Sequence, residues 1–297
     1  MTTTDTIELP THSTSHATLP FAALAPSPAP APAVGSMGQL ADETPDVMTL
    51  HTQDAFRMFT GRAADAQSQV FAIPGGRRFA AVLKSIWYLS ANDNPYADWI
   101  LIRVYQTLLA IRSQMAQAIA AREADFEALR RKGLNLSVLR SRSPATVELG
   151  FRSPYGYATA EAIVEFDYHV RMVKTLVLKD RLSDDDGREA IRQIGRGLRA
   201  LFLEPIRWER LLLREELLLL SRRDFLPSAD DVARQRMHIA VTMFGEVPRA
   251  VFTGDDAPRH SQRRITPTAA ELRLLRQVSL SIYEQGAPLE AAAEQLL

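Results

Sequence analysis

Apolar side chains recur at helical spacing along most of this chain. Between residues 79 and 87 they follow the i, i+3, i+4, i+7, i+8 order of an amphipathic helix, at Phe79, Val82, Leu83, Ile86 and Trp87. The same spacing and its capping residues predict further helices over residues 53–62, 95–132, 157–180, 184–202, 231–244 and 268–285. We expect Pro205 to kink or end the helix that begins after Ser183.

Two stretches alternate apolar and polar side chains instead. Residues 47–52 do so just ahead of a predicted helix, and residues 146–151 alternate Val147, Leu149 and Phe151 with polar or small residues. Because residues 134–151 lack helical spacing throughout, a two-stranded ribbon fits them best. The predicted fold class is mainly α, a multi-helix bundle with a small β-ribbon.

Composition divides the chain into four parts. Residues 1–46 are rich in Thr, Ser, Ala and Pro, and we expect a disordered tail there. A helical core domain with a short β-ribbon is expected over residues 47–248. Residues 249–266 contain Gly254, Pro258 and several charges, which predicts a polar linker before a C-terminal helix in residues 267–297.

The same composition excludes several classes of protein. The chain has 46% hydrophobic residues but no apolar stretch long enough to cross a bilayer, so we expect a globular protein without a membrane partner. No Lys or Arg precedes Arg57, so no secretory signal is recognised and a cytoplasmic location is expected. The absence of cysteine excludes disulfides, thiolate nucleophiles and thiolate metal sites.

The charge is unevenly distributed. The first fifty residues hold five acids and no base, which leaves 35 basic against 30 acidic residues in the rest of the chain. All but four of the basic residues are arginines, which suit bidentate contacts to phosphate or guanine. A GC-rich genome would produce the same preference for arginine.

Motifs for catalysis or metal binding are missing. No phosphate-binding loop, zinc-peptidase, serine-hydrolase or calcium-loop pattern occurs, and the histidines lack metal-ligand spacing. Asp167 and His169 are two residues apart, so a helix would direct them to different sides, and we interpret His169 as a surface histidine. The sequence therefore predicts no catalytic residue, no metal and no cofactor.

Two groups of arginines favour nucleic acid. Gly75 and Gly76 precede Arg77 and Arg78 at a predicted helix start, where free backbone N–H groups and guanidiniums attract phosphate. Arg140, Arg142 and Arg152 flank the candidate ribbon, and a ribbon can enter the major groove of DNA. The alternatives are a solvated first turn in one case and an ordinary hairpin with exposed arginines in the other.

Several short blocks together resemble a known family. They are Leu50-His51-Thr52, Phe59-Thr60-Gly61-Arg62, Phe79-Ala80, Ile86-Trp87, Asp93-Asn94-Pro95-Tyr96-Ala97-Asp98-Trp99, Pro154-Tyr155-Gly156-Tyr157 and Phe166-Asp167. In this combination the chain, over roughly residues 47–247, resembles integrating conjugative element proteins grouped with the AcaB-like transcriptional regulators. The resemblance implies a DNA-binding regulator of conjugative transfer or element maintenance. It also implies a ribbon-helix-helix type element in a homodimer, each chain supplying one strand.

Two placements of the DNA-reading strand stay open. If the strand lies in residues 48–52, the expected DNA contacts are Thr49, His51, Arg77 and Arg78. If it lies in residues 146–151, the expected contacts are Arg140, Arg142, Thr146 and Arg152.

Two other kinds of function are weighed against DNA binding. An accessory protein of the conjugation or integration machinery would contact other conjugation proteins through an exposed apolar stripe on the helix of residues 96–132. An enzyme would require Asp98, Asp167, His169 or Glu165 to converge in one pocket.

Overall fold

The computed structural model describes residues 43–64 and 71–278. Within these residues the helices and strands follow in the order β1 (Val47–Leu50), α1 (Gln53–Thr60), α2 (Gly76–Ala91), α3 (Pro95–Arg131), β2 (Ala145–Glu148), α4 (Pro154–Leu178), α5 (Asp184–Leu212), the 3-10 helix η1 (Arg222–Phe225), α6 (Asp231–Phe244), α7 (Arg249–Thr253) and α8 (Ala269–Gln277). The mainly helical fold with a two-stranded ribbon is confirmed. The predicted tail lies outside the described residues up to residue 42.

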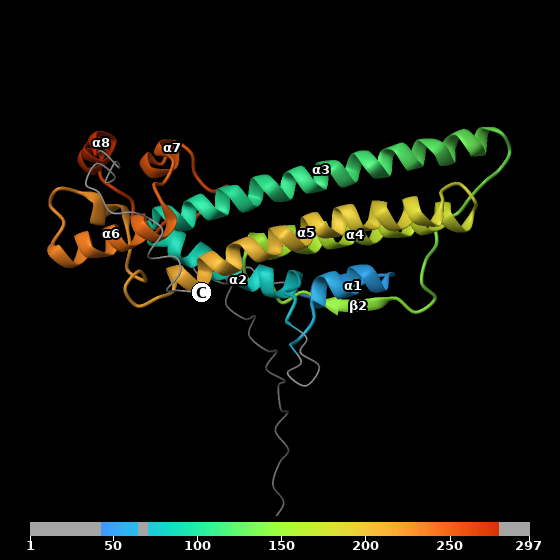
Figure 1. Ribbon diagram of the computed structural model, residues 1–297, viewed down its shortest axis with the longest axis horizontal. Helices are drawn as coiled ribbons and strands as arrows, with labels where there is room; N and C mark the ends of the chain where they lie inside the picture. The colour runs from blue at the N-terminus through green and yellow to red at the C-terminus, as the bar shows by residue number, and fades with distance from the viewer. Residues whose placement is uncertain (1–42, 65–70, 279–297) are drawn as a thin grey trace, which may run out of the picture. The chain divides into compact units, whose positions relative to one another are not determined.

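Four helices, α2, α3, α4 and α5, form a bundle in which each contacts the other three (Figure 1). The helices α3 and α5 begin where the sequence predicts, because a side chain accepts a backbone N–H at each start: Asn94 caps α3 and Ser183 caps α5. The helix α4 is capped by Ser153 and begins at Pro154, three residues before the predicted start. The Phe79 and Phe202 rings, whose centroids are 4.7 Å apart, join α2 to α5 in the core.

The helix α5 does not end at Pro205. It continues to Leu212 with Pro205 buried inside it. Proline removes one helical hydrogen bond, but the apolar side chains on both sides of it, Leu201 and Leu212, remain buried. Core packing on either side of the proline therefore keeps the helix in one piece.

The ribbon joins two segments that are nearly one hundred residues apart. β1 and β2 are antiparallel, with Met48 opposite Val147, Thr49 opposite Thr146 and Leu50 opposite Ala145. The expected hairpin within residues 134–151 is wrong, because only Ala145–Glu148 of it forms a strand. The residues before β2 follow α4 instead: Leu139 N–H donates to Thr175 Oγ1 at 3.0 Å, and Arg171 Nε donates to Leu139 O at 2.8 Å.

The C-terminal part is more ordered than a linker. Residues 249–266, which the sequence indicates as a polar linker, contain α7, and Val251 and Phe252 of this helix are buried. Two adjacent apolar residues among polar ones form no periodic pattern, so the spacing of apolar residues does not predict this short helix. The helix predicted for residues 268–285 is α8, and the part after residue 278 lies outside the described residues.

Candidate nucleic-acid interface

The ribbon has one buried and one exposed face. Met48 and Leu50 point into the core, while Val47, Thr49, Thr146 and Glu148 are exposed. Since Thr49 and Thr146 are paired in the register, their side chains stand next to each other on the exposed face. The two predicted placements of the reading strand thus belong to one ribbon, formed within one chain.

A buried carboxylate holds the end of β1. Asp167, on α4, accepts three hydrogen bonds at Oδ1: from the N–H of His51 at 3.0 Å, the N–H of Thr52 at 2.8 Å and the hydroxyl of Thr52 at 2.8 Å. The Thr52 oxygen in turn accepts the N–H of Ala55 at 3.2 Å and caps α1. Asp167 therefore fixes the junction of the ribbon and α1 on α4. His51 lies at this junction and is half-buried.

Three of the predicted arginines surround β2. Arg140 and Arg142 lie in the extended segment before the strand and Arg152 lies after it, and all three are exposed. Arg142 and Arg152 have no ion pair within residues 43–64 and 71–278. Burial and the hydrogen bond to Glu123 raise the pKa of the Tyr168 hydroxyl on α4, and the positive charge of Arg140 partly opposes that shift.

The helix α2 begins at a close backbone contact. Gly75 is its N-cap, and a Cβ at this position would lie 2.3 Å from the Gly61 nitrogen, so only glycine fits. Arg77 is exposed and lies over the Phe59 ring, 5.5 Å from its centroid. Arg78 links α2 to α5, since its Nη2 donates to the buried Glu209 Oε2 at 2.7 Å.

The four residues that an enzyme would need do not converge. Each carboxylate accepts a hydrogen bond from a different part of the fold: Asp98 from Ser90, Glu165 from Arg112, and Asp167 from the end of the ribbon. The prediction that His169 is a surface residue is wrong: it is 1% exposed, packed where α4 faces α5, with Nε2 3.4 Å from Ala190 O. Burial lowers its pKa to about 4.

A second buried cluster, which the pattern of the sequence does not predict, contains Asp93 and Asp98 of the Asp93–Trp99 block. Arg222 is 1% exposed and its guanidinium donates to Asp93 Oδ1 at 2.7 Å and Asp98 Oδ2 at 2.8 Å. It also donates to the carbonyls of Val251 and Phe252, each at 2.7 Å. Burial raises the pKa of the Asp93 carboxyl, and the charge of Arg222 opposes that shift. This cluster attaches η1 and α7 to the start of α3.

The feature expected of an accessory protein is not found on α3. In its C-terminal half, Ile119, Phe126 and Leu129 are half-buried, and no apolar stripe is exposed on the described helix. Among the residues that the structure covers, no group of three metal-ligating side chains and no helix able to span a membrane occur.

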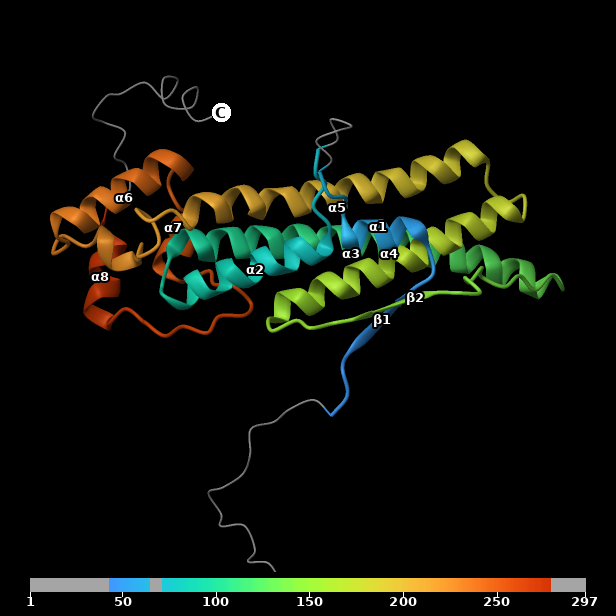
Figure 2. The same cartoon turned by 90° about the horizontal axis from the view of Figure 1, so that it is seen from below.

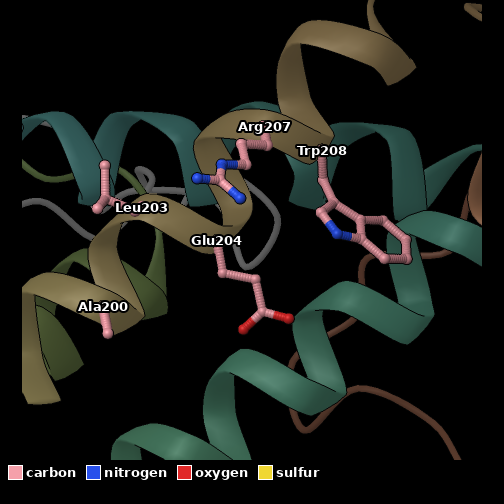
Figure 3. Close-up of a pocket in the computed structure, with 5 residues that line it drawn as sticks. All are labelled: Ala200, Leu203, Glu204, Arg207 and Trp208. Carbon is pink, nitrogen blue, oxygen red and sulfur yellow. The ribbon is translucent and has the colours of Figure 1, made fainter. Parts of the chain in front are cut away.

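One shallow hollow of about 340 Å³ lies against α5. It is lined by Ala200, Leu203, Glu204, Arg207 and Trp208, and Figure 3 shows Glu204 and Trp208 extending from α5 toward the neighbouring α3. Glu204 is paired with Arg103 of α3 at 2.6 Å. The hollow has no set of converging polar groups that would hold a small ligand.

Comparisons with known proteins identify a family. A family model described as "Transcriptional regulator AcaB" matches residues 36–264. No curated protein matches the chain. A crystal structure of selenomethionine-containing AcaB from uropathogenic E. coli is 15% identical, covers 80% of this chain and 98% of its own, and gives a TM-score of 0.41. The match of the family model includes the ribbon, the bundle and the Arg222 cluster, and the chain therefore belongs to the AcaB family of transcriptional regulators.

Proposed function

We propose that this chain is a DNA-binding regulator of transfer or maintenance genes of an integrating conjugative element, and that the exposed face of the β1–β2 ribbon reads the bases. The observation that carries the proposal is the pair of Thr49 and Thr146, exposed side by side on a ribbon whose other face is buried. The conjugative context comes from the sequence blocks, among them Leu50-His51-Thr52 and Pro154-Tyr155-Gly156-Tyr157.

A two-stranded ribbon fits the major groove of B-DNA, which is about 12 Å wide. Threonine hydroxyls donate and accept hydrogen bonds at base edges, and threonine methyl groups contact the thymine methyl. Glu148, on the same face, would accept from the amino group of cytosine. Base reading therefore rests on Thr49, Thr146 and Glu148.

Arginines beside the ribbon supply phosphate contacts in this proposal. Arg142 and Arg152 are exposed at the two ends of β2, and Arg77 is exposed at the start of α2 with free backbone N–H groups beside it. Phosphate contacts fix the position of the protein on the duplex without selecting a sequence. His51 and Arg78 have less freedom to reach DNA, because the His51 N–H already bonds Asp167 of α4 and the Arg78 guanidinium bonds Glu209 of α5. Arg140 is exposed before β2 and belongs with the candidate phosphate contacts.

A homodimer is part of the proposal. The ribbon is complete within one chain, so dimerisation is not needed to form it. Two copies would instead present two ribbons to two half-sites, at a spacing of about 34–36 Å when they bind the same face of the duplex. Light scattering with and without DNA measures the mass, and a single copy on a saturated palindromic site would contradict the dimer.

The test of base reading compares two double variants. Thr49→Ala/Thr146→Ala removes both hydroxyls from the ribbon, and Thr107→Ala/Thr242→Ala removes two exposed hydroxyls from α3 and α6. We measure the ratio of affinities for DNA from the protein's own element and for unrelated DNA of equal length. We expect the ribbon variant to lose about 10-fold or more of this ratio, equivalent to about 1–3 kcal/mol of base discrimination, and the control to keep it. An unchanged ratio in the ribbon variant, with an unchanged circular dichroism spectrum, overturns the proposal.

A further inference from the structure

The exposed face of α5 carries a row of arginines. Arg192, Arg196, Arg199, Arg207 and Arg210 are all exposed, and their spacing returns to one side of the helix at each turn. Leu203 occupies the remaining position in the row and is 42% exposed. We call these five arginines the arginine stripe.

The positive charge of the stripe is poorly neutralised. Arg192 and Arg196 share one acid, Glu189, at 3.4 and 2.5 Å. Arg199, Arg207 and Arg210 have no ion pair in the described part of the chain.

The nearest acids of the same helix are already engaged. Glu204 pairs with Arg103 of α3 at 2.6 Å, and Glu209 is buried against Arg78 of α2 at 2.7 Å. Neither carboxylate is therefore available to the arginine stripe. The part of the stripe from Arg199 to Arg210 is a net cationic surface.

The stripe and the ribbon face different directions. Helix α5 packs against α2, α3 and α4, so its exposed face points away from these helices. The ribbon packs on α4, and Figure 2 shows the ribbon and α5 on opposite sides with α4 between them. A straight duplex on the ribbon would not reach the stripe.

The chemistry of the stripe suits the DNA backbone. Arginine forms bidentate, charge-assisted hydrogen bonds with phosphate. From Arg199 to Arg210 the helix rises by about 17 Å. That length matches roughly five phosphates of one strand at about 3.4 Å each. A protein partner is favoured less, because a protein interface needs an apolar centre and Leu203 is the one exposed large apolar residue within the stripe.

We propose that the arginine stripe is a second, sequence-independent DNA-binding surface, and that one molecule holds a DNA segment there while another segment lies on the ribbon. The regulator thereby bridges two DNA segments. This inference rests on the proposal that the protein binds DNA, and it does not depend on which side chains read the bases.

A bridging assay tests it. A biotinylated fragment of the protein's own element is fixed to beads, and we measure the capture of a fluorescent, unrelated duplex by the full-length protein. Arg199→Gln/Arg207→Gln/Arg210→Gln removes three charges from the stripe. Arg130→Gln/Arg131→Gln/Lys132→Gln removes three exposed charges from the far end of α3 as a matched control.

We expect the stripe variant to lose bridging by 10-fold or more while it keeps its preference for the fixed fragment. Its binding to unrelated duplex should show a salt slope smaller by about 2–3, since each lost phosphate contact lowers the slope by about 0.9. The control variant should bridge like the wild type.

Four results overturn the inference. Bridging by the stripe variant at the wild-type level shows that the stripe does not hold DNA, and an acidic protein then becomes its candidate partner. Equal loss in stripe and control variants shows a general charge effect. A wild type that prefers its own fragment but does not bridge contradicts this inference alone, whereas a wild type without any DNA binding contradicts the proposed function as well.

Discussion

Arg222 and Asp98 form an ion pair that is closed to solvent: Nη2 lies 2.8 Å from Oδ2, and their side chains are 1% and 0% exposed. The same guanidinium bonds Asp93, and Arg263 reaches Asp98 Oδ2 at 3.0 Å. A residue of η1 and one of the C-terminal segment thus meet the first turn of α3. The family match ends at residue 264, directly after Arg263, so the cluster lies within the shared region.

Removing Arg222 should destabilise the fold strongly. Arg222→Ala leaves the carboxylates of Asp93 and Asp98 buried with much less compensation, and breaking a buried pair in this way costs about 3–5 kcal/mol. Chemical denaturation measures the change in the free energy of unfolding. Arg188→Ala, which removes only an exposed pair with Asp185 on α5, should change it far less. Equal effects of the two variants would contradict the role of the cluster.

Replacing Asp167 should destabilise the junction of the ribbon and α1. Asp167→Ala leaves the N–H groups of His51 and Thr52 and the Thr52 hydroxyl without their acceptor, so we expect a loss of about 2–4 kcal/mol and faster hydrogen exchange in β1. Asp54→Ala, which removes an exposed acid from α1 that pairs with Lys174, is the control. Unchanged exchange in β1 would show that the ribbon is held by its apolar face alone.

The sequence predicts features that depend on neighbouring residues, and it misses contacts between segments far apart in the chain. The limits of α3, α4 and α6 follow from apolar spacing and from caps such as Asn94 and Ser153, which are local signals. The pairing of β1 with β2 and the contact of Arg222 with Asp98 join segments about one hundred residues apart, which a periodic pattern does not encode. For this reason the sequence predicts Thr49 and Thr146 on alternative reading strands, whereas the structure pairs them in one ribbon.

Stability should fall in mild acid because of His169. Burial lowers its pKa to about 4, so the folded state keeps this imidazole neutral, while the unfolded chain protonates it near pH 6.5. The stabilising contribution is full above pH 6.5 and is lost as the pH falls from 6.5 to about 4. The shift corresponds to about 3 kcal/mol.

To test this prediction, the free energy of unfolding in denaturant is measured at pH 7 and pH 5 for the wild type and for His169→Gln. Arg122, whose charge also lowers the His169 pKa, stays protonated throughout. We expect the free energy of unfolding of the wild type to fall more steeply between the two pH values than that of the variant, because the other titrating groups are common to both. Parallel pH dependences would contradict a neutral buried imidazole.

Variants of the adjacent residues Arg77 and Arg78 should distinguish an effect on DNA binding from an effect on stability. Arg77 is exposed and lies over Phe59, so Arg77→Ala should cost at most about 1 kcal/mol of stability. If Arg77 contacts a phosphate, the variant should bind all DNA more weakly, with a salt slope smaller by about 0.9. Arg78→Ala leaves the buried Glu209 unpaired and should lower stability by about 1–3 kcal/mol, with the smaller effect on the salt slope. Binding titrations at several salt concentrations, together with thermal unfolding, distinguish the two roles. A larger change of slope for Arg78→Ala than for Arg77→Ala would show that Arg78 exchanges Glu209 for phosphate when DNA binds, and would contradict the assignment of Arg77 as the phosphate contact.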